Sequence, residues 1–248
     1  GCHHCAAVIM RLVTHNVYWC QGASFGTFPP AAPRAEIIAG LVALWRQWQI
    51  DLCCLQELQD TDAARQVATA ASAGDWWHAP GRLVERPHYG VAILAPRGSR
   101  QAHTVQHPCL ERSALRATRS RDGLTIANLH LRSNRFAPKP VADVQRLEEL
   151  RAILEQGTAP DLVLGDFNAR LGDAVWQELR DRGYHDAMEL ALPDAGPLPG
   201  PMKGDRLWLS ATLRPQFRAA GTIPVEAARL PSGEGLSDHL AVWLDLAV

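Results

Sequence analysis

The chain has 248 residues, of which 47% are hydrophobic and 21% are charged, and its formal net charge is −1. A charge so close to neutral argues against a protein that coats nucleic acid with its whole surface. No apolar run approaches the ~18 residues that a membrane span needs. A chain of this length can form one α/β domain and bury roughly three quarters of its unfolded surface.

In chain order, the apolar periodicity predicts strand 8–13, helix 35–48, strand 52–55, helix 61–73, and strands 90–95, 103–105, 114–118 and 124–131. Helix 141–155, strand 161–164, helix 173–182 and strands 207–209 and 240–244 follow. Strand–helix–strand units favour parallel pairs, whereas consecutive strands favour antiparallel hairpins. The pattern therefore predicts mixed sheets with helices on their outer faces.

The chain ahead of Met10 reads as an upstream extension, residues 1–9, because the first strand follows Met10 at once. Within it, Cys2-His3-His4-Cys5 offers zinc-binding atoms at a spacing too tight for an ordinary four-ligand site. The six cysteines form no regular disulfide framework, and the neighbours Cys53 and Cys54 point to opposite faces of one strand. With no secretory signal evident, we expect a cytoplasmic protein.

Three segments rich in Gly and Pro, 19–32, 133–140 and 192–203, lie between the predicted elements. Such density of Gly and Pro prevents regular structure. Each segment adjoins a polar motif at a strand end, so we interpret all three as loops that face a substrate. Trp76 and Trp77 fit the core or its rim better than a role in stacking on a base or lipid.

Polar residues gather where the predicted strands begin or end. They are Asn16, Glu57, His130, Asp166 with Asn168, Asp205, and Asp238 with His239. Burying such groups without partners costs roughly 2–7 kcal/mol each, so they belong in a polar cleft rather than in the core. Gathered there, carboxylates, an amide and imidazoles can hold a hard divalent cation and transfer protons.

Each of these motifs is weak alone, because Gly-Asp-x-Asn or Ser-Asp-His also occurs by chance. Together, in this order and each at a strand end, they resemble the endonuclease/exonuclease/phosphatase superfamily over residues 10–248. That superfamily includes pancreatic-type deoxyribonucleases, abasic-site endonucleases, sphingomyelinases, inositol-polyphosphate 5-phosphatases and deadenylases. The resemblance implies a catalytic domain folded as a four-layer α/β sandwich, with two stacked mixed β-sheets flanked by helices.

The resemblance also implies Mg²⁺ or Mn²⁺ as cofactor. It assigns the ion to Glu57, with Asn16 and Asp238 as further contributors to its surroundings. A solvated glutamate after a strand is the simpler interpretation of Glu57 by itself. The accompanying motifs favour the metal ligand, since Mg²⁺ needs only one or two carboxylates beside waters and a substrate phosphate.

The catalytic roles come from the same resemblance. Asp166 is expected to orient or deprotonate the attacking water, and Asn168 to bind that water or the phosphoryl oxygens. An Asx-turn is the alternative for this pair. His239, paired with Asp205, is expected to be the acid/base or phosphate-stabilising group. His130 is expected to contact a phosphoryl oxygen, with a buried structural histidine as the alternative.

Several further residues leave two interpretations open. Tyr89 begins a segment similar to one that lines the site in the family, and Arg112 and Arg116 lie in another. For both arginines, phosphate contact and a solvated position are equally compatible with the sequence. A short basic cluster, Arg132, Arg135 and Lys139, follows His130 and can hold a phosphate or remain a solvated surface.

The predicted activity is metal-dependent hydrolysis of a phosphate ester by an activated water. The substrate is either a small or lipid-like phosphoester, cleaved by a phosphodiesterase or phosphatase, or DNA or RNA, cleaved by an endonuclease or exonuclease. A non-catalytic binding module on the same fold is the third possibility, and the complete set of polar motifs argues against it. The short basic cluster favours a small ester or a nucleic-acid end over long duplexes. We expect a monomer.

Overall fold

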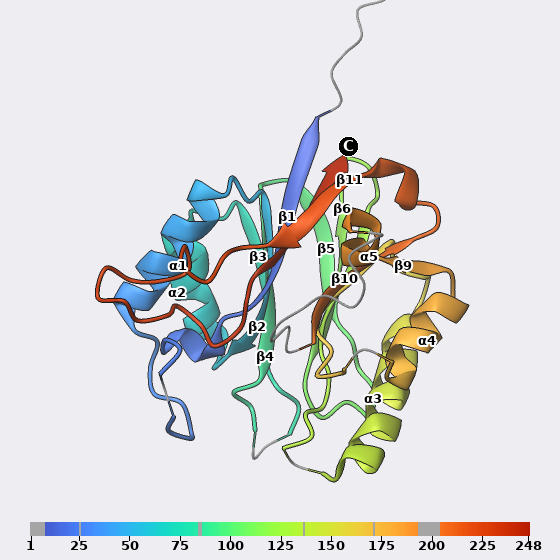
Figure 1. Cartoon of the computed structure of the whole chain (residues 1–248), viewed down its shortest axis with the longest axis horizontal. Coiled ribbons are helices and arrows are strands. Elements are labelled where there is room, and N and C mark those ends of the chain that lie inside the picture. The colour runs from blue at the N-terminus through green and yellow to red at the C-terminus, as the bar shows by residue number, and fades with distance from the viewer. Residues whose placement is uncertain (1–7, 25, 84–85, 136, 171, 193–203) are drawn as a thin grey trace, which may run out of the picture.

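The computed structural model describes residues 8–24, 26–83, 86–135, 137–170, 172–192 and 204–248. Two six-stranded sheets stack face to face. Helices α1 and α2 lie outside one sheet and α3 and α4 outside the other (Figure 1). The four-layer sandwich expected from the sequence is therefore confirmed.

The first sheet has the strand order β11-β12-β1-β2-β4-β3. Its strands are β1 (Ile9–Asn16), β2 (Leu52–Leu58), β3 (Asp75–Ala79), β4 (Gly90–Ala95), β11 (Phe217–Thr222) and β12 (Val242–Ala247). Strands β1 and β2 are parallel, and the other neighbours are antiparallel. The apolar sides of α1 (Ala35–Gln47) and α2 (Thr61–Ala71) pack on its outer face.

The second sheet has the strand order β5-β6-β7-β8-β10-β9. Its strands are β5 (Ser99–Thr104), β6 (Ala114–Arg119), β7 (Thr125–His130), β8 (Leu162–Asp166), β9 (Tyr184–Asp186) and β10 (Asp205–Ser210). Strands β7 and β8 are its parallel pair. Helices α3 (Lys139–Leu154) and α4 (Ala174–Asp181) cover its outer face, and the short α5 (Ala187–Ala191) follows β9.

Each sheet thus has a parallel pair near its centre, and the carboxyl ends of these pairs meet at one end of the sandwich. The register places His130 opposite Asp166 across β7 and β8, and Asp166 opposite Asp205 across β8 and β10. In the other sheet, Asn16 lies opposite Gln56. Strand pairing alone therefore brings residues far apart in sequence to the same edge.

Between the sheets lies an apolar core, and a cluster of polar side chains around Asn128 crosses it. Asn128 of β7 donates hydrogen bonds to the carbonyl oxygens of Leu55 (3.1 Å) and Ala92 (2.8 Å) in the opposite sheet. It accepts one from the Gln56 amide at 2.7 Å, and Gln56 in turn bonds Thr14. This fully buried cluster fixes the two sheets relative to each other beside the residues that end β1 and β2.

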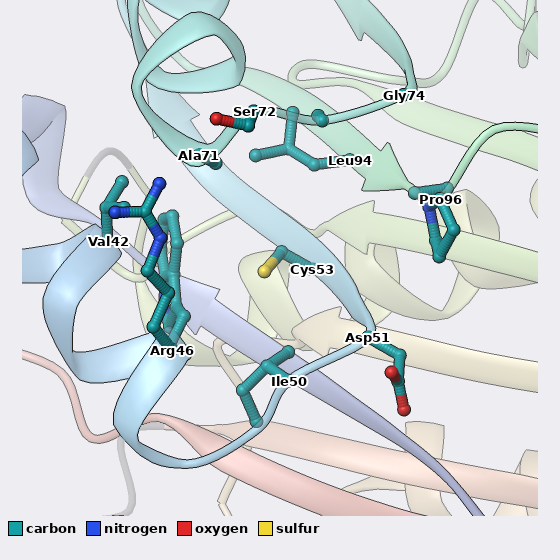
Figure 2. A pocket seen from close by; sticks show the side chains of 13 residues that line it. Val42, Arg46, Ile50, Asp51, Cys53, Ala71, Ser72, Gly74, Leu94 and Pro96 are labelled. Carbon is teal, nitrogen blue, oxygen red and sulfur yellow. The ribbon is translucent and has the colours of Figure 1, made fainter.

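The neighbouring cysteines of β2 point to opposite faces, as the sequence predicts. Cys54 packs in the core between the sheets, and Cys53 packs on the side of α1 and α2. Figure 2 shows the Cys53 side chain in a pocket of about 290 Å³, between Arg46 and Asp51. Burial raises the pKa of the Cys53 thiol, so it stays protonated at neutral pH. The described cysteines are free thiols.

The predicted elements occur, most with shifted ends. The structure adds the strands β3, β9 and β11, the helix α5 and two short 3-10 helices, η1 (Tyr18–Cys20) and η2 (Arg214–Gln216). The last strand begins at Val242 rather than Leu240 and continues to Ala247. Strand β3 carries Trp76 and Trp77, whose side chains pack on the outer and inner faces of the first sheet. This confirms the interpretation of both tryptophans as core or rim residues.

At the N-terminus, β1 already begins at Ile9, which pairs with Ala247, and Val248 donates a hydrogen bond to the Val8 carbonyl. The Cys2-His3-His4-Cys5 cluster lies outside the described residues, as does most of the Pro-rich segment 192–203. Within the described part of the chain, no helix has the length and apolar character to cross a membrane.

Candidate active site

The structure brings the predicted site residues together at the end of the sandwich where the two parallel pairs finish. Asn16, Glu57, His130, Asp166 and Asp205 are buried, whereas Asn168, Asp238 and His239 are partly exposed. Asn16 and Glu57 come from the first sheet, and His130, Asp166 and Asp205 come from the second, so the site spans both layers. Both the metal-binding and the catalytic candidates lie there.

Glu57 lies in β2 at an irregularity of the strand. The register with β4 shifts between Gln56 and Leu58, and Glu57 has φ +58°, a conformation uncommon outside glycine. Its Oε1 is 3.8 Å from both Arg112 Nη1 and His130 Nε2, and its buried Oε2 has no hydrogen-bond partner within the described chain. Burial raises the pKa of Glu57, against the opposing charge of Arg112.

Asn16 ends β1 and orients its neighbours. Its Nδ2 donates to Asp166 Oδ2 at 3.2 Å, and its Oδ1 accepts from the backbone N–H of Tyr18 at 3.0 Å. The Ser237 hydroxyl donates to the Asn16 carbonyl at 2.6 Å and accepts the N–H of His239 at 3.1 Å. The segment that carries Asp238 and His239 is thereby tied to the end of β1.

Asp166 is the residue that the two halves of the site share. With Glu57 and His130 it forms one group of possible ligand atoms within 4.8 Å of one another, and with Asp205 and His239 it forms another. Burial, together with the nearby Asp205 carboxylate, raises the pKa of Asp166 to about 7. A carboxyl group with such a pKa can exchange a proton near neutral pH.

Asp166 and Asn168 also form the local turn that the sequence offered as an alternative. The Asn168 N–H donates to Asp166 Oδ1 at 2.8 Å, and Asn168 has φ +49°. The Asn168 side chain donates to the Leu131 carbonyl at 3.0 Å. The turn therefore coexists with the cleft, because it uses Asp166 Oδ1 and leaves Oδ2 beside Asn16.

His239 and Asp205 form a close pair, with 2.7 Å between Nδ1 and Oδ2. Asp238 Oδ1 lies 3.7 Å from the other ring nitrogen. Burial lowers the pKa of His239, but the charge and hydrogen bond of Asp205, with the charges of Asp166 and Asp238, outweigh it and raise the pKa to about 10. His239 is therefore an imidazolium at neutral pH.

His130 is buried and neutral. Burial lowers its pKa well below the ordinary value, and the positive charges of Arg112 and His239 act in the same direction. Arg112 Nη1 lies 3.2 Å from His130 Nδ1. A guanidinium only donates, so Nδ1 accepts and the proton of His130 is on Nε2. That Nε2 is 3.4 Å from Asp166 Oδ2.

The sequence left the roles of Tyr89, Arg112 and Arg116 open. The structure places Tyr89 and Arg112 in the site and Arg116 outside it. Arg112 is only 4% exposed, and its guanidinium stacks on the Tyr89 ring at 4.0 Å from the centroid. Arg116, four positions further along, instead donates a hydrogen bond to the Thr158 carbonyl outside the second sheet. Residues four apart on one strand would share a face, but Arg112 precedes the first residue of β6, so strand alternation does not fix its direction.

Tyr18 is a residue near the site that sequence reasoning missed. Its backbone N–H bonds the Asn16 side chain, and burial raises its pKa, with the charges of Asp238 and Glu57 acting in the same direction. Its ring stacks on Trp19 with centroids 5.0 Å apart, and Trp19 lies 5.5 Å from Tyr89. Tyr18, Trp19 and Cys20 all have positive φ, at 45°, 54° and 52°. No sequence pattern marks such a turn.

The basic cluster after His130 is largely neutralised by nearby acids. Arg132 is paired with Glu111, and Lys139 lies 2.6 Å from Asp143 and 3.0 Å from Asp173. Lys139 is the first residue of α3 rather than part of a loop. The cluster therefore offers fewer cationic contacts to a substrate than the sequence allowed.

Comparisons with known proteins agree with this arrangement. A family model described as Endonuclease/Exonuclease/phosphatase family matches residues 13–239. The chain belongs to this family. A search of the curated proteins found no match.

Among solved structures, an endonuclease/exonuclease/phosphatase from Beutenbergia cavernae superposes with a TM-score of 0.71 at 18% identity, covering 97% of this chain and 72% of that one. TDP2 of D. rerio, complexed with single strand DNA product, has a TM-score of 0.67 at 17% identity, with 97% and 99% covered. The catalytic domain of human Nocturnin, with a bound sulfate anion, has a TM-score of 0.64 at 18% identity, with 96% and 92% covered. At these identities the likeness establishes the fold.

Proposed function

We propose that the protein hydrolyses phosphate esters with a divalent cation, Mg²⁺ or Mn²⁺, and an activated water. The observation that supports this most is the double group around Asp166, in which Glu57 and His130 lie on one side and Asp205 and His239 on the other. Such a site can bind a cation, hold a phosphoryl group and move a proton at once.

Glu57 is the proposed centre of the cation site, with Asn16 and Asp238 beside it. The fit rests on the buried Oε2 of Glu57, which has no hydrogen-bond partner among the described residues, and on oxygen donors that a hard cation prefers. When bound, the cation supplies charge neutralisation at the phosphoryl oxygens. Burial of Glu57 without such a charge would favour its protonated form.

Asp166 is the proposed base that takes a proton from the attacking water. The water oxygen then bonds to phosphorus as the bond to the leaving oxygen breaks. The pKa of Asp166, raised to about 7 by burial and by Asp205, makes its carboxylate a competent acceptor near neutral pH. Asn168 is proposed to bind the phosphoryl oxygens or that water.

His239 and His130 are proposed to donate hydrogen bonds to the phosphoryl group. His239 does so as an imidazolium whose Nδ1 is held by Asp205, so that Nε2–H faces outward from the pair. His130 does so as a neutral ring, with its proton on Nε2 because Arg112 donates to Nδ1. Donors fixed in place before the reaction stabilise charge that develops on oxygen at no cost in reorganisation.

Release of nitrophenol from bis(4-nitrophenyl) phosphate tests the proposal. We expect turnover with Mg²⁺ or Mn²⁺, none in excess chelator, and recovery when the ion is added back. Glu57→Gln should weaken metal affinity and leave the fold intact, whereas Glu226→Gln, at an exposed position, should change neither. Full activity in excess chelator would exclude the metal assignment, and no activity with any divalent ion would favour a binding module.

The substrate class is a narrower proposal. Aromatic rings of Tyr18, Trp19 and Tyr89 lie beside the site, and the basic cluster is short and largely paired. These features favour a small or lipid-like phosphoester, or a short nucleic-acid end, over a long duplex. The single strand DNA product in D. rerio TDP2 gives the nucleic-acid end its support.

A panel of plasmid DNA, abasic DNA, RNA, a short single-stranded oligonucleotide, phosphoinositides and sphingomyelin distinguishes these substrates. We expect the largest kcat/KM on a short nucleic-acid end or on one of the small or lipid-like esters. A plasmid cleaved faster than all of these would instead favour an endonuclease.

A further inference from the structure

Arg116 is a buried arginine outside the active site. It lies in the middle of β6, opposite Ala127 of β7 and His103 of β5. Its neighbours Leu115 and Ala117 point into the core between the sheets, so the Arg116 side chain lies on the outer face. It is only 5% exposed. The proposed active site lies beyond the first residue of β6, on the side of Arg112. Arg116 therefore occupies a separate place in the fold.

The guanidinium of Arg116 is only partly satisfied. One nitrogen, Nη2, donates to the Thr158 carbonyl just after α3. The other, Nη1, is buried and has no hydrogen-bond partner among the described residues. Within the same part of the chain, no carboxylate lies within ion-pair distance of Arg116. Burial lowers the pKa of Arg116, with only Tyr184 acting against it.

A buried cation without a counter-ion is unusual, because the desolvation of a charged group costs several kcal/mol that a single carbonyl cannot offset. Native proteins compensate such a charge with a carboxylate, a metal-bound group or a bound anion. The described chain supplies none of these to Arg116. The structure therefore has a place for an anion from solution.

A cavity of about 260 Å³ lies at this place, lined by Arg116. Hydroxyl and imidazole groups line it as well, from Thr118 and His103 on the sheet and from Thr158 on the loop after α3. The lining includes no acidic side chain. The cavity is many times larger than the ~30 Å³ that one water occupies in the liquid. The cavity thus offers hydrogen-bond donors around a guanidinium and no acidic side chain that would repel an anion. This lining suits a tetrahedral oxyanion.

We propose that this cavity binds an oxyanion, phosphate or a small phosphate monoester, with Arg116 as the charged partner and the Thr118 hydroxyl as a second donor. The site lies on the outer face of the second sheet and shares no residue with the proposed active site. Ligand binding there compensates the buried guanidinium. It thus stabilises the folded chain without being required for catalysis.

Binding of inorganic phosphate tests this proposal in the His239→Ala protein with excess chelator, which weakens phosphate binding at the active site. Thermal unfolding and isothermal titration are compared with chloride at equal ionic strength. We expect a saturable rise in Tm. Arg116→Met should lower phosphate affinity by on the order of tenfold or more, whereas Arg121→Met, at an exposed arginine of the next turn, should not.

Titration with glycerol 3-phosphate distinguishes the two candidate ligands, inorganic phosphate and a phosphate monoester. Tighter binding of this ester than of inorganic phosphate, lost in Arg116→Met, would identify a monoester site, and the reverse order would identify a site for the free ion. Should Arg116→Met fail to fold, Thr118→Val serves instead, since Thr118 is partly exposed and the change conserves its volume. An equal phosphate effect in wild type, Arg116→Met and Thr118→Val would overturn the proposal, as would no effect in wild type.

Discussion

His239 has the chemical properties proposed for it because of its partner Asp205. Burial favours a neutral imidazole and lowers the pKa of His130, whereas the carboxylate 2.7 Å from Nδ1 raises the pKa of His239 to about 10. The same residue type thus has two protonation states within one site. Burial lowers the pKa of both rings; Asp205 reverses this effect at His239, whereas Arg112 adds to it at His130.

This dependence leads to a prediction about double substitution. His239→Ala should lower kcat by about 10²–10⁴-fold, the range for a positioned acid/base group, and Asp205→Asn should lower it as well. The double variant should be little worse than His239→Ala, because residues that act as a unit are not additive. Steady-state kinetics on bis(4-nitrophenyl) phosphate measure all three. Losses that multiply would mean that Asp205 does not act through His239.

His78 gives a prediction about stability that does not involve the site. Burial lowers its pKa from 6.5 to about 4. As pH falls from about 6.5, the unfolded chain binds this proton before the folded one, so stability present above pH 6.5 is lost towards pH 4. His78→Gln should reduce the slope of the unfolding free energy in this window by up to ~1.4 kcal/mol per pH unit.

Urea unfolding at a series of pH values measures that slope. Above pH 7 the wild type and His78→Gln should have the same slope, because His78 is neutral in both states there. His15, whose pKa burial also lowers to about 4, should account for part of the slope that remains in the variant. Identical slopes between pH 4 and 6.5 would contradict the assignment to His78.

At the level of elements, the contact between β7 and the opposite sheet combines stability with positioning of the site. The Asn128 side chain donates hydrogen bonds to the carbonyls of Leu55 and Ala92. It accepts one from the amide of Gln56, which directly precedes Glu57. An apolar residue would pack in the same space but would leave these polar groups without partners. The Asn128 amide therefore contributes to the stacking of the sheets beside the site.

Asn128→Leu should accordingly lower the free energy of unfolding by roughly 2–4 kcal/mol, the cost of several buried groups left unsatisfied. Chemical denaturation measures this loss. Gln177→Leu, the same kind of change at an exposed position of α4, is the control and should alter stability by less than about 0.5 kcal/mol. A loss no larger than that of the control would mean that the cross-sheet bonds contribute little.

For the whole molecule, charge distribution decides how a substrate is held. The net charge is −1, and Arg132 and Lys139 are already paired with acids. A protein that tracks a duplex neutralises many phosphates and loses affinity steeply with salt. Among the residues that the structure describes near the site, few cations are unpaired, so we expect substrates to be held by local contacts.

Activity across a salt series therefore discriminates the substrate classes. On short phosphodiesters, kcat/KM should fall with salt by a log–log slope no steeper than about 2–3. Supercoiled plasmid should be a poor substrate over the same range. Robust nicking of plasmid that is steeply inhibited by salt would contradict this expectation and favour a deoxyribonuclease-like enzyme.

The sequence by itself determined most of the elements, the mixed sheets with helices outside them, and the set of polar residues near strand ends, and its resemblance to a family implied the sandwich. Apolar periodicity marks strands and helices, and the cost of burying polar groups explains why Glu57, Asp166 and His239 had to lie at strand ends. Elements without a strong pattern escaped prediction. The short edge strand β9 has only three residues, and β11 contains two alanines and a glycine.

Only the tertiary structure decided how these residues act on one another. Proximity across two sheets makes Asp166 the shared member of both groups, and it separates Arg112 in the site from Arg116 behind the second sheet. The unusual turn at Tyr18 also appears only in three dimensions. The physical reason is that pKa values and ligand geometry depend on distance and burial, which contacts between residues remote in sequence determine.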